Sequence, residues 1–194
     1  MSKQIKIQPA AGKLGILTPG MGAVATTFIA GVIAARKGIA LPIGSLTQMG
    51  TIRLGKRTED RNPKIKDFIP LAGLDQITFG GWDVYSDNVY QAAVQAKVLE
   101  PALVEQLKDE LQEISPMKAV FDKKYVRNLD GTHVKSGADK MELAEQLMAD
   151  IRRFKAEKGC DRLVMVWCAS TEAYTEISDV HESLEAFEAG LRNN

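Results

Sequence analysis

One stretch of the chain, residues 13–37, limits the possible fold more than any other. It begins with the apolar run 14–17, which has the length of a buried parallel strand. Small residues then form a turn at 19–23, and apolar residues recur at helical spacing until Gly38 supplies a stop signal. These apolar residues lie on two stripes: Val24, Phe28 and Val32 on one, and Ala25, Ile29 and Ile33 on the next. The stretch predicts a strand, a glycine turn and a buried helix, the first half of a βαβ unit.

The turn from Gly20 to Ala25 has the spacing Gly-x-Gly-x-x-Ala. In this pattern the first glycine permits a tight turn, and the second, Gly22, removes a Cβ atom that would strike bound phosphates. The small Ala25 allows the helix to pack closely on the strand. The pattern therefore predicts a pyrophosphate site at a helix N-terminus. The alternative is a strand-to-helix turn that uses its glycines only for their backbone angles.

Length and charge argue against several other classes of protein. A chain of 194 residues is long enough for a core and is expected to be one domain. Its formal net charge of zero argues against nucleic acid and against an anionic membrane as partners. No apolar run approaches the roughly 20 residues of a membrane span, and the first ten residues do not resemble a signal peptide. The two cysteines, Cys160 and Cys168, lack metal-type spacing and indicate a reducing compartment, so we expect a soluble cytoplasmic protein.

Strand and helix patterns alternate along the rest of the chain. Strands are predicted at 39–43, 77–84, 119–121 and 162–167, and a leader at 1–12 is expected to add an edge strand through Ile5 and Ile7. Helices are predicted at 88–99, 101–114 and 139–158, and a last helix begins near Ser178 with Leu184, Phe187 and Leu191 facing inward. This alternation predicts an α/β protein with a Rossmann-like, doubly wound, mainly parallel sheet and helices on both faces.

A dinucleotide site usually has an Asp or Glu at the end of its second strand, where the carboxylate binds the adenosine ribose. The predicted second strand, 39–43, runs instead into Gly44-Ser45-Leu46-Thr47-Gln48, which holds no carboxylate. This departure argues against an ordinary NAD-linked dehydrogenase. A carboxylate does lie at the end of the predicted strand 77–84, where Asp83 is placed to accept hydrogen bonds from a sugar diol. Asp83 is equally well placed to cap the helix that begins near Asn88.

Two polar segments and two histidines remain. The turn Cys168-Ala169-Ser170-Thr171 suits a bound cofactor, although an ordinary turn has the same composition and no base beside Cys168 marks it as a nucleophile. The charged segment 51–66 fits a solvated loop better than a phosphate-binding loop, because its acidic and basic residues nearly cancel. His133 and His181 have no second ligand at metal spacing and are expected to be solvated. No residue is predicted to be catalytic or to bind a metal ion.

Together these motifs resemble the amino-terminal portion of the myo-inositol-1-phosphate synthase family, also called inositol-3-phosphate synthases. Four blocks carry the resemblance: Gly20-Met21-Gly22-Ala23 with Ala25-Thr26-Thr27; Gly44-Ser45-Leu46-Thr47-Gln48 with Thr51 and Leu54-Gly55; Gly81-Trp82-Asp83; and Val166-Trp167 with Ser170-Thr171-Glu172. The family has serine and threonine after 39–43, which accounts for the absent carboxylate. Its eukaryotic branch has a glycine- and asparagine-rich turn where this chain has Ala23-Val24-Ala25, so the resemblance points to the prokaryotic branch.

The resemblance implies an isomerase that converts D-glucose 6-phosphate to 1D-myo-inositol 3-phosphate with tightly held NAD. The sugar loses a hydride to the cofactor, closes into a ring through an enolate, and regains the hydride at the ring ketone. By motif, Gly20, Met21, Gly22, Ala23 and Val24 are implied to hold the pyrophosphate, and Asp83 the adenosine ribose. Cys168, Ala169, Ser170 and Thr171 are implied to line the cofactor crevice, with Ala119 and Val120 on its adenine side.

The resemblance also implies what the chain lacks. Members of the family are homotetramers with a much longer chain, and their catalytic lysines and tetramer-forming sheet are expected beyond Asn194. Residues 1–194 are therefore expected to form the NAD-binding domain without the proton-transfer groups, and to be inactive alone. A non-catalytic NAD-binding module is the competing hypothesis.

Overall fold

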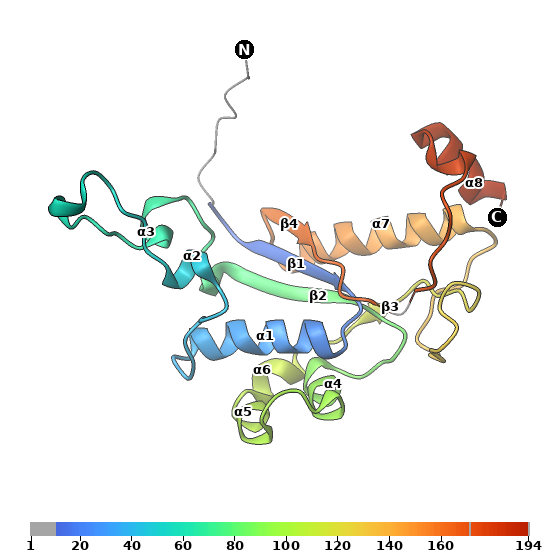
Figure 1. Ribbon diagram of the computed structural model, residues 1–194. Coiled ribbons are helices and arrows are strands. Elements are labelled where there is room, and N and C mark those ends of the chain that lie inside the picture. Colours follow the sequence, from blue (N-terminus) through green and yellow to red (C-terminus); the bar gives the residue numbers. More distant parts are fainter. Residues whose placement is uncertain (1–10, 171, 194) are drawn as a thin grey trace, which may run out of the picture.

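The computed structural model describes residues 11–170 and 172–193, and its central feature is a four-stranded parallel sheet (Figure 1). The strands are β1 (Leu14–Pro19), β2 (Ile77–Asp83), β3 (Met117–Lys118) and β4 (Arg162–Met165). They lie in the order β3-β2-β1-β4, and all three neighbouring pairs are parallel. The order and the pairing confirm the predicted Rossmann-like fold. The predicted edge strand through Ile5 and Ile7 lies outside the described residues.

Helices cover both faces of the sheet, as predicted (Figure 1). One face carries α1 (Ala23–Arg36), α4 (Val89–Ala96), α5 (Pro101–Gln106) and α6 (Lys108–Gln112), and the other carries α7 (Lys140–Glu157). Alternate side chains of a strand point to opposite faces. Ile16 of β1 and Phe79 of β2 accordingly pack in the core beneath α1, whereas Leu17 and Trp82 pack in the core beneath α7.

The buried face of α1 follows one of its two predicted stripes. Ala25, Ile29 and Ile33 are buried, because this stripe faces the sheet. Val24 and Phe28 on the other stripe are 61% and 38% exposed. The Phe28 ring still meets the core, since it lies edge-on to the Phe79 ring with the centroids 5.6 Å apart.

Two glycines allow α7 to lie directly on the strand backbone. A Cβ atom on Gly15 of β1 would lie 2.9 Å from Cε1 of Phe154, and one on Gly80 of β2 would lie 2.5 Å from Cε2 of the same ring. Real Cβ atoms do not approach carbon so closely, so Phe154 fills the space that these glycines leave open. Asp139 begins α7 as predicted, because its carboxylate accepts a hydrogen bond of 2.8 Å from the Glu142 amide.

The predicted strand at 39–43 is wrong. The amides of Ile39 and Ala40 both bond to the Ala34 carbonyl, which turns the chain away from the sheet, and Leu41 and Ile43 are exposed. The chain then forms an arm of short helices before it returns: α2 (Leu46–Met49), η1 (Arg57–Glu59), α3 (Ile65–Phe68) and η2 (Leu74–Gln76). This arm projects from the amino-terminal end of the sheet (Figure 1), and its charged residues at 51–61 are largely exposed, as expected of a solvated loop. The place beside β1 is taken by β2.

Four smaller predictions also need correction. The predicted helix 101–114 is two helices, because the backbone of Leu107 leaves the helical region, and Leu107 and Leu111 are both fully buried. The short strand predicted at 119–121 is β3, two residues earlier. The last helix, α8 (Leu184–Asn193), begins after a separate turn η3 (Asp179–His181), and its Leu184 and Phe187 are exposed rather than inward. His181 is exposed, as expected, but His133 is half-buried with its Nδ1 atom buried, so the expectation that it is solvated is wrong. Within the described part of the chain, no helix is both long and apolar enough to cross a membrane.

Candidate functional site

The candidate site lies at the carboxyl ends of the parallel strands, where an open α/β sheet forms its ligand crevice. β1 delivers the glycine turn there, β2 delivers Asp83, β3 delivers Ala119 and Val120, and β4 leads into the turn at 168–170. The parallel topology alone therefore places at one edge of the sheet the described residues that the sequence predicted to bind the cofactor. Thr171, the remaining nominated residue, lies outside the described residues.

Gly20 occupies the tightest point of this edge. Its φ of +82° is a left-handed conformation that favours glycine, and its amide donates a 2.9 Å hydrogen bond to the Trp82 carbonyl. A Cβ atom here would lie 2.7 Å from the backbone nitrogen of Ala169. Gly20 is therefore required both by its backbone angle and by the close approach of the β4 turn.

Gly22 has the opposite surroundings. It precedes α1 as the N-cap residue, and a Cβ atom on it would meet no described atom within 4 Å. Among the described residues no side chain caps α1, and its first turn contains no acidic residue. The first amides of a helix have no partner within it, so this N-terminus points positive charge into open space. Such an arrangement fits a phosphate group.

Asp83 ties β2 to the glycine turn. Its Oδ2 atom accepts a 2.6 Å hydrogen bond from the Met21 amide, and its Oδ1 atom accepts one of 3.1 Å from the Tyr85 amide. The helix-cap alternative is wrong, because α4 is capped by Asn88, whose side chain accepts from the Gln91 amide at 2.9 Å. Each carboxylate oxygen of Asp83 has a second lone pair left for a ligand hydroxyl.

The carboxylate expected after the second strand is therefore present. The strand beside β1 in the sheet is β2, and Asp83 is its last residue. The arm between α1 and β2 concealed this correspondence, since it separates the glycine turn from Asp83 by far more than the usual interval of about 20 residues. A search for the next strand ending in a carboxylate, without a limit on distance, would have found it.

The turn after β4 is bonded to the end of β1, beside the glycine turn. The amides of Cys168 and Ala169 both donate to the Pro19 carbonyl at 2.9 Å. Burial raises the pKa of the Cys168 thiol, which keeps it protonated and agrees with the absence of a nucleophile signal in the sequence. Ser170, the next residue, is exposed at the same edge.

The other residues predicted to bind the cofactor differ in how exposed they are. Ala119 is 8% exposed and Val120 is 39% exposed, one strand beyond Asp83. Ala23 and Val24 are exposed at the start of α1. Met21 is buried and its amide donates to Asp83, so Met21 helps to fix the conformation of the glycine turn.

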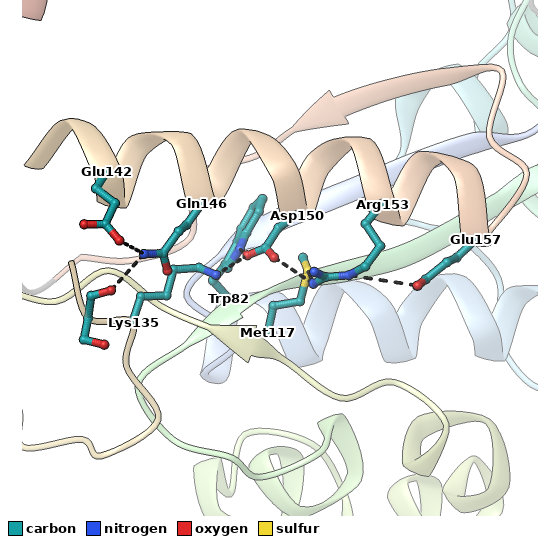
Figure 2. Close-up of polar contacts among 9 residues, drawn as sticks. Trp82, Met117, Lys135, Glu142, Gln146, Asp150, Arg153 and Glu157 are labelled. Carbon is teal, nitrogen blue, oxygen red and sulfur yellow. Dashed lines mark hydrogen bonds and ion pairs between the residues drawn. The ribbon is translucent and has the colours of Figure 1, made fainter.

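One cluster beside the site was missed in the sequence. Asp150 of α7 is 2% exposed, and its carboxylate receives the Trp82 indole nitrogen at 2.9 Å, the Lys135 ammonium at 2.7 Å and the Arg153 guanidinium at 2.7 Å (Figure 2). Burial alone would raise the pKa of Asp150, but the hydrogen bonds from Lys135 and Trp82 outweigh it and lower that pKa. The available signal was a carboxylate at position 150 on the apolar stripe of a helix.

Comparison with known proteins agrees with this geometry. The family model described as myo-inositol-1-phosphate synthase, an NAD-binding model, matches residues 14–194. A curated relative, inositol-3-phosphate synthase 1 of Bacteroides thetaiotaomicron, is 49% identical over 190 residues, which are 97% of this chain and 44% of the relative. This chain belongs to the myo-inositol-1-phosphate synthase family.

Other members support the assignment. The probable inositol 3-phosphate synthase isozyme 3 of Arabidopsis thaliana is 34% identical over 180 residues, which are 85% of this chain and 35% of the plant protein. The crystal structure of inositol-3-phosphate synthase from Caenorhabditis elegans superimposes with a TM-score of 0.84 at 26% identity, over 96% of this chain and 40% of that one. The chain thus spans less than half the length of these synthases. The higher identity to the bacterial protein agrees with the predicted prokaryotic branch.

Proposed function

We propose that this chain binds NAD in the crevice at the carboxyl ends of β1, β2 and β4, as the cofactor-binding part of an inositol-3-phosphate synthase. The observation that carries the proposal is the open space in front of Gly22, at an α1 N-terminus that lacks a capping side chain among the described residues. That space fits a pyrophosphate, which the first amides of α1 would bind. Asp83 at the end of β2 would accept the hydroxyls of the adenosine ribose.

The rest of the edge would complete the site. The backbone of Ala169 and Cys168 would form one wall, and Ala119 and Val120 would flank the adenine. NAD, when bound, supplies a hydride acceptor and donor. The chain's own residues would orient it, and in the complete enzyme this would support conversion of D-glucose 6-phosphate to 1D-myo-inositol 3-phosphate. The family's homotetrameric assembly is part of the same proposal for the complete enzyme.

A non-catalytic NAD-binding module is the second candidate. A lysine that moves protons needs to be desolvated and free of a counter-ion. Lys135 is largely buried, with 10% of its side chain exposed, but its ammonium is paired with Asp150. This pairing favours a binding role for the described residues.

Calorimetric titration of the full 194-residue chain tests the proposal. We expect one saturable site for NAD and weaker binding of NADP, because the Asp83 carboxylate would repel a 2′-phosphate. Saturable NAD binding with no preference over NADP would remove Asp83 from the ribose position. Absence of NAD binding at millimolar concentration would refute the function.

A further inference from the structure

Asp150 holds together two segments that are far apart in the sequence. Through Oδ2 it binds both the Trp82 indole of β2 and the Lys135 ammonium (Figure 2). Among the described residues it is the one charged residue that is buried, at 2% exposure. A buried carboxylate is stable only while its partners stay in place, so the cluster fixes those partners as much as they fix it.

The Lys135 side of the cluster leads to the adenine side of the crevice. The segment 133–135 runs beside the end of β3: the Lys135 amide donates to the Ala119 carbonyl at 2.8 Å, and the Ala119 amide donates to the His133 carbonyl at 3.1 Å. The His133 amide also donates to the Val84 carbonyl at 2.9 Å. Ala119 therefore takes its position from a segment that the buried Lys135–Asp150 pair attaches to α7, beside a second bond of 2.8 Å from the Gln146 side chain to the Ser136 carbonyl.

The Trp82 side leads to the ribose and pyrophosphate positions. The Trp82 carbonyl accepts the Gly20 amide, and the next residue, Asp83, accepts the Met21 amide. Asp150 thus binds the indole of Trp82, and Trp82 and its neighbour Asp83 hold the glycine turn in place.

We propose that Asp150 is a positioning residue of the nucleotide site, setting the adenine side of the crevice relative to the Trp82–Asp83 side. This proposal rests on the proposed NAD function. Asp150 touches no ligand itself; it acts through Lys135 and Trp82. Outer hydrogen-bonding partners of this kind hold binding residues in productive geometry.

The test compares three variants of the full chain by NAD titration and thermal unfolding. Asp150→Asn keeps the shape and an acceptor for Trp82 but leaves the Lys135 ammonium without its counter-ion, so we expect both a lower Tm and a weaker NAD affinity. Outer partners at metal sites are worth about 10- to 100-fold in affinity, and we expect a loss of about tenfold here. ADP-ribose, which keeps the adenosine and pyrophosphate but lacks the nicotinamide, is expected to lose the same factor.

The double variant Asp150→Asn with Lys135→Met separates positioning from stability. It removes both buried charges, which is often neutral for stability, so we expect its Tm to return toward that of the parent. Its NAD affinity is expected to stay low, because 133–135 has lost its buried ion pair to α7 and keeps only the neighbouring bond from Gln146 to the Ser136 carbonyl and the packing of Val134. Glu110→Gln is the matched control: it removes a carboxylate–lysine pair, Glu110–Lys37, that joins α6 to α1 away from the crevice, and it should leave NAD affinity unchanged.

Each contrary outcome has a distinct meaning. Parent-like NAD affinity in Asp150→Asn, recovery of affinity together with Tm in the double variant, or a loss for NAD but not for ADP-ribose would overturn the positioning role while leaving the proposed function intact. Absence of NAD binding by the parent would overturn both.

Discussion

Replacing Gly22 with valine is the sharpest test of the phosphate position. The Gly22 φ of −81° lies outside the left-handed region that favours glycine, and a Cβ atom there meets no described atom within 4 Å. The change should therefore lower the free energy of unfolding by only about 1 kcal/mol, the cost of a poorer N-cap residue. A bound pyrophosphate, however, would have to share that space with the valine methyl groups.

The expected loss follows from the hydrogen bonds that the valine would displace. A hydrogen bond from a backbone amide to a charged oxygen is worth about 1.5–3 kcal/mol. Loss of one such bond corresponds to an NAD affinity that is weaker by about 10- to 100-fold. Isothermal titration of the variant and the parent measures this ratio, and urea unfolding of both proteins checks that the fold is retained.

Gly31→Val supplies the matched control. Gly31 also has open space at its Cβ position, but it lies within α1, away from the glycine turn. It should keep the parent's NAD affinity. Equal affinities for Gly22→Val and the parent, with both folded, would refute the argument that the open space before α1 receives the pyrophosphate.

Four further predictions follow from the same contacts. Asp83→Asn keeps an acceptor for the Met21 amide but removes the charge, so NAD affinity measured by titration should fall by about 1–3 kcal/mol; a lower Tm at unchanged affinity would show that Asp83 only supports the turn. Phe154→Ala removes a ring that is 6% exposed and rests on Gly15 and Gly80, so urea unfolding should show a loss of about 3–5 kcal/mol, and a loss below about 1 kcal/mol would contradict that packing. The lowered pKa of Asp150 stabilises the fold above the unfolded-state pKa of about 3.9, and this stabilisation is lost as the pH falls through the lower folded-state pKa. Unfolding measured from pH 5 downward should therefore be less acid-sensitive in the double variant Asp150→Asn with Lys135→Met, and identical acid limbs would contradict this assignment. The 194-residue chain incubated with D-glucose 6-phosphate and NAD should form no inositol phosphate, and turnover would show that the proton-transfer groups lie within these residues.

The parts of the fold that local interactions specify were predictable from the sequence. Local sequence signals specify the first strand, the glycine turn and α1, which follow one another directly in the chain. The start of α7 is also specified locally, because the Asp139 side chain caps it. The carboxyl-end position of Asp83 was also predictable, because any parallel strand at 77–84 ends on the crevice edge. The family resemblance followed from the same motifs.

The parts that depend on distant partners were not predictable in the same way. Residues 39–43 have a strand-like composition, but a strand forms only if a neighbour accepts it, and β1 is already paired with β2 and β4. The role of Asp83 in holding Met21, and that of Asp150 in holding Trp82 and Lys135, join residues far apart along the chain. Periodicity reports which face of an element is apolar, but it cannot report which polar groups meet.

The sheet order also fixes when the molecule can assemble during synthesis. The first strand to leave the ribosome is central, and its partners come late: Leu14 pairs with Ile77 and with Arg162. Closing such long loops is slow, and a nascent chain that has emerged only as far as β2 lacks one of the two neighbours of β1. The Gly20 contact with Ala169 involves the turn that follows β4, the strand synthesised last among those described. A ligand that contacts both the glycine turn and the turn at 168–170 therefore gains its full set of contacts only after β4 has docked.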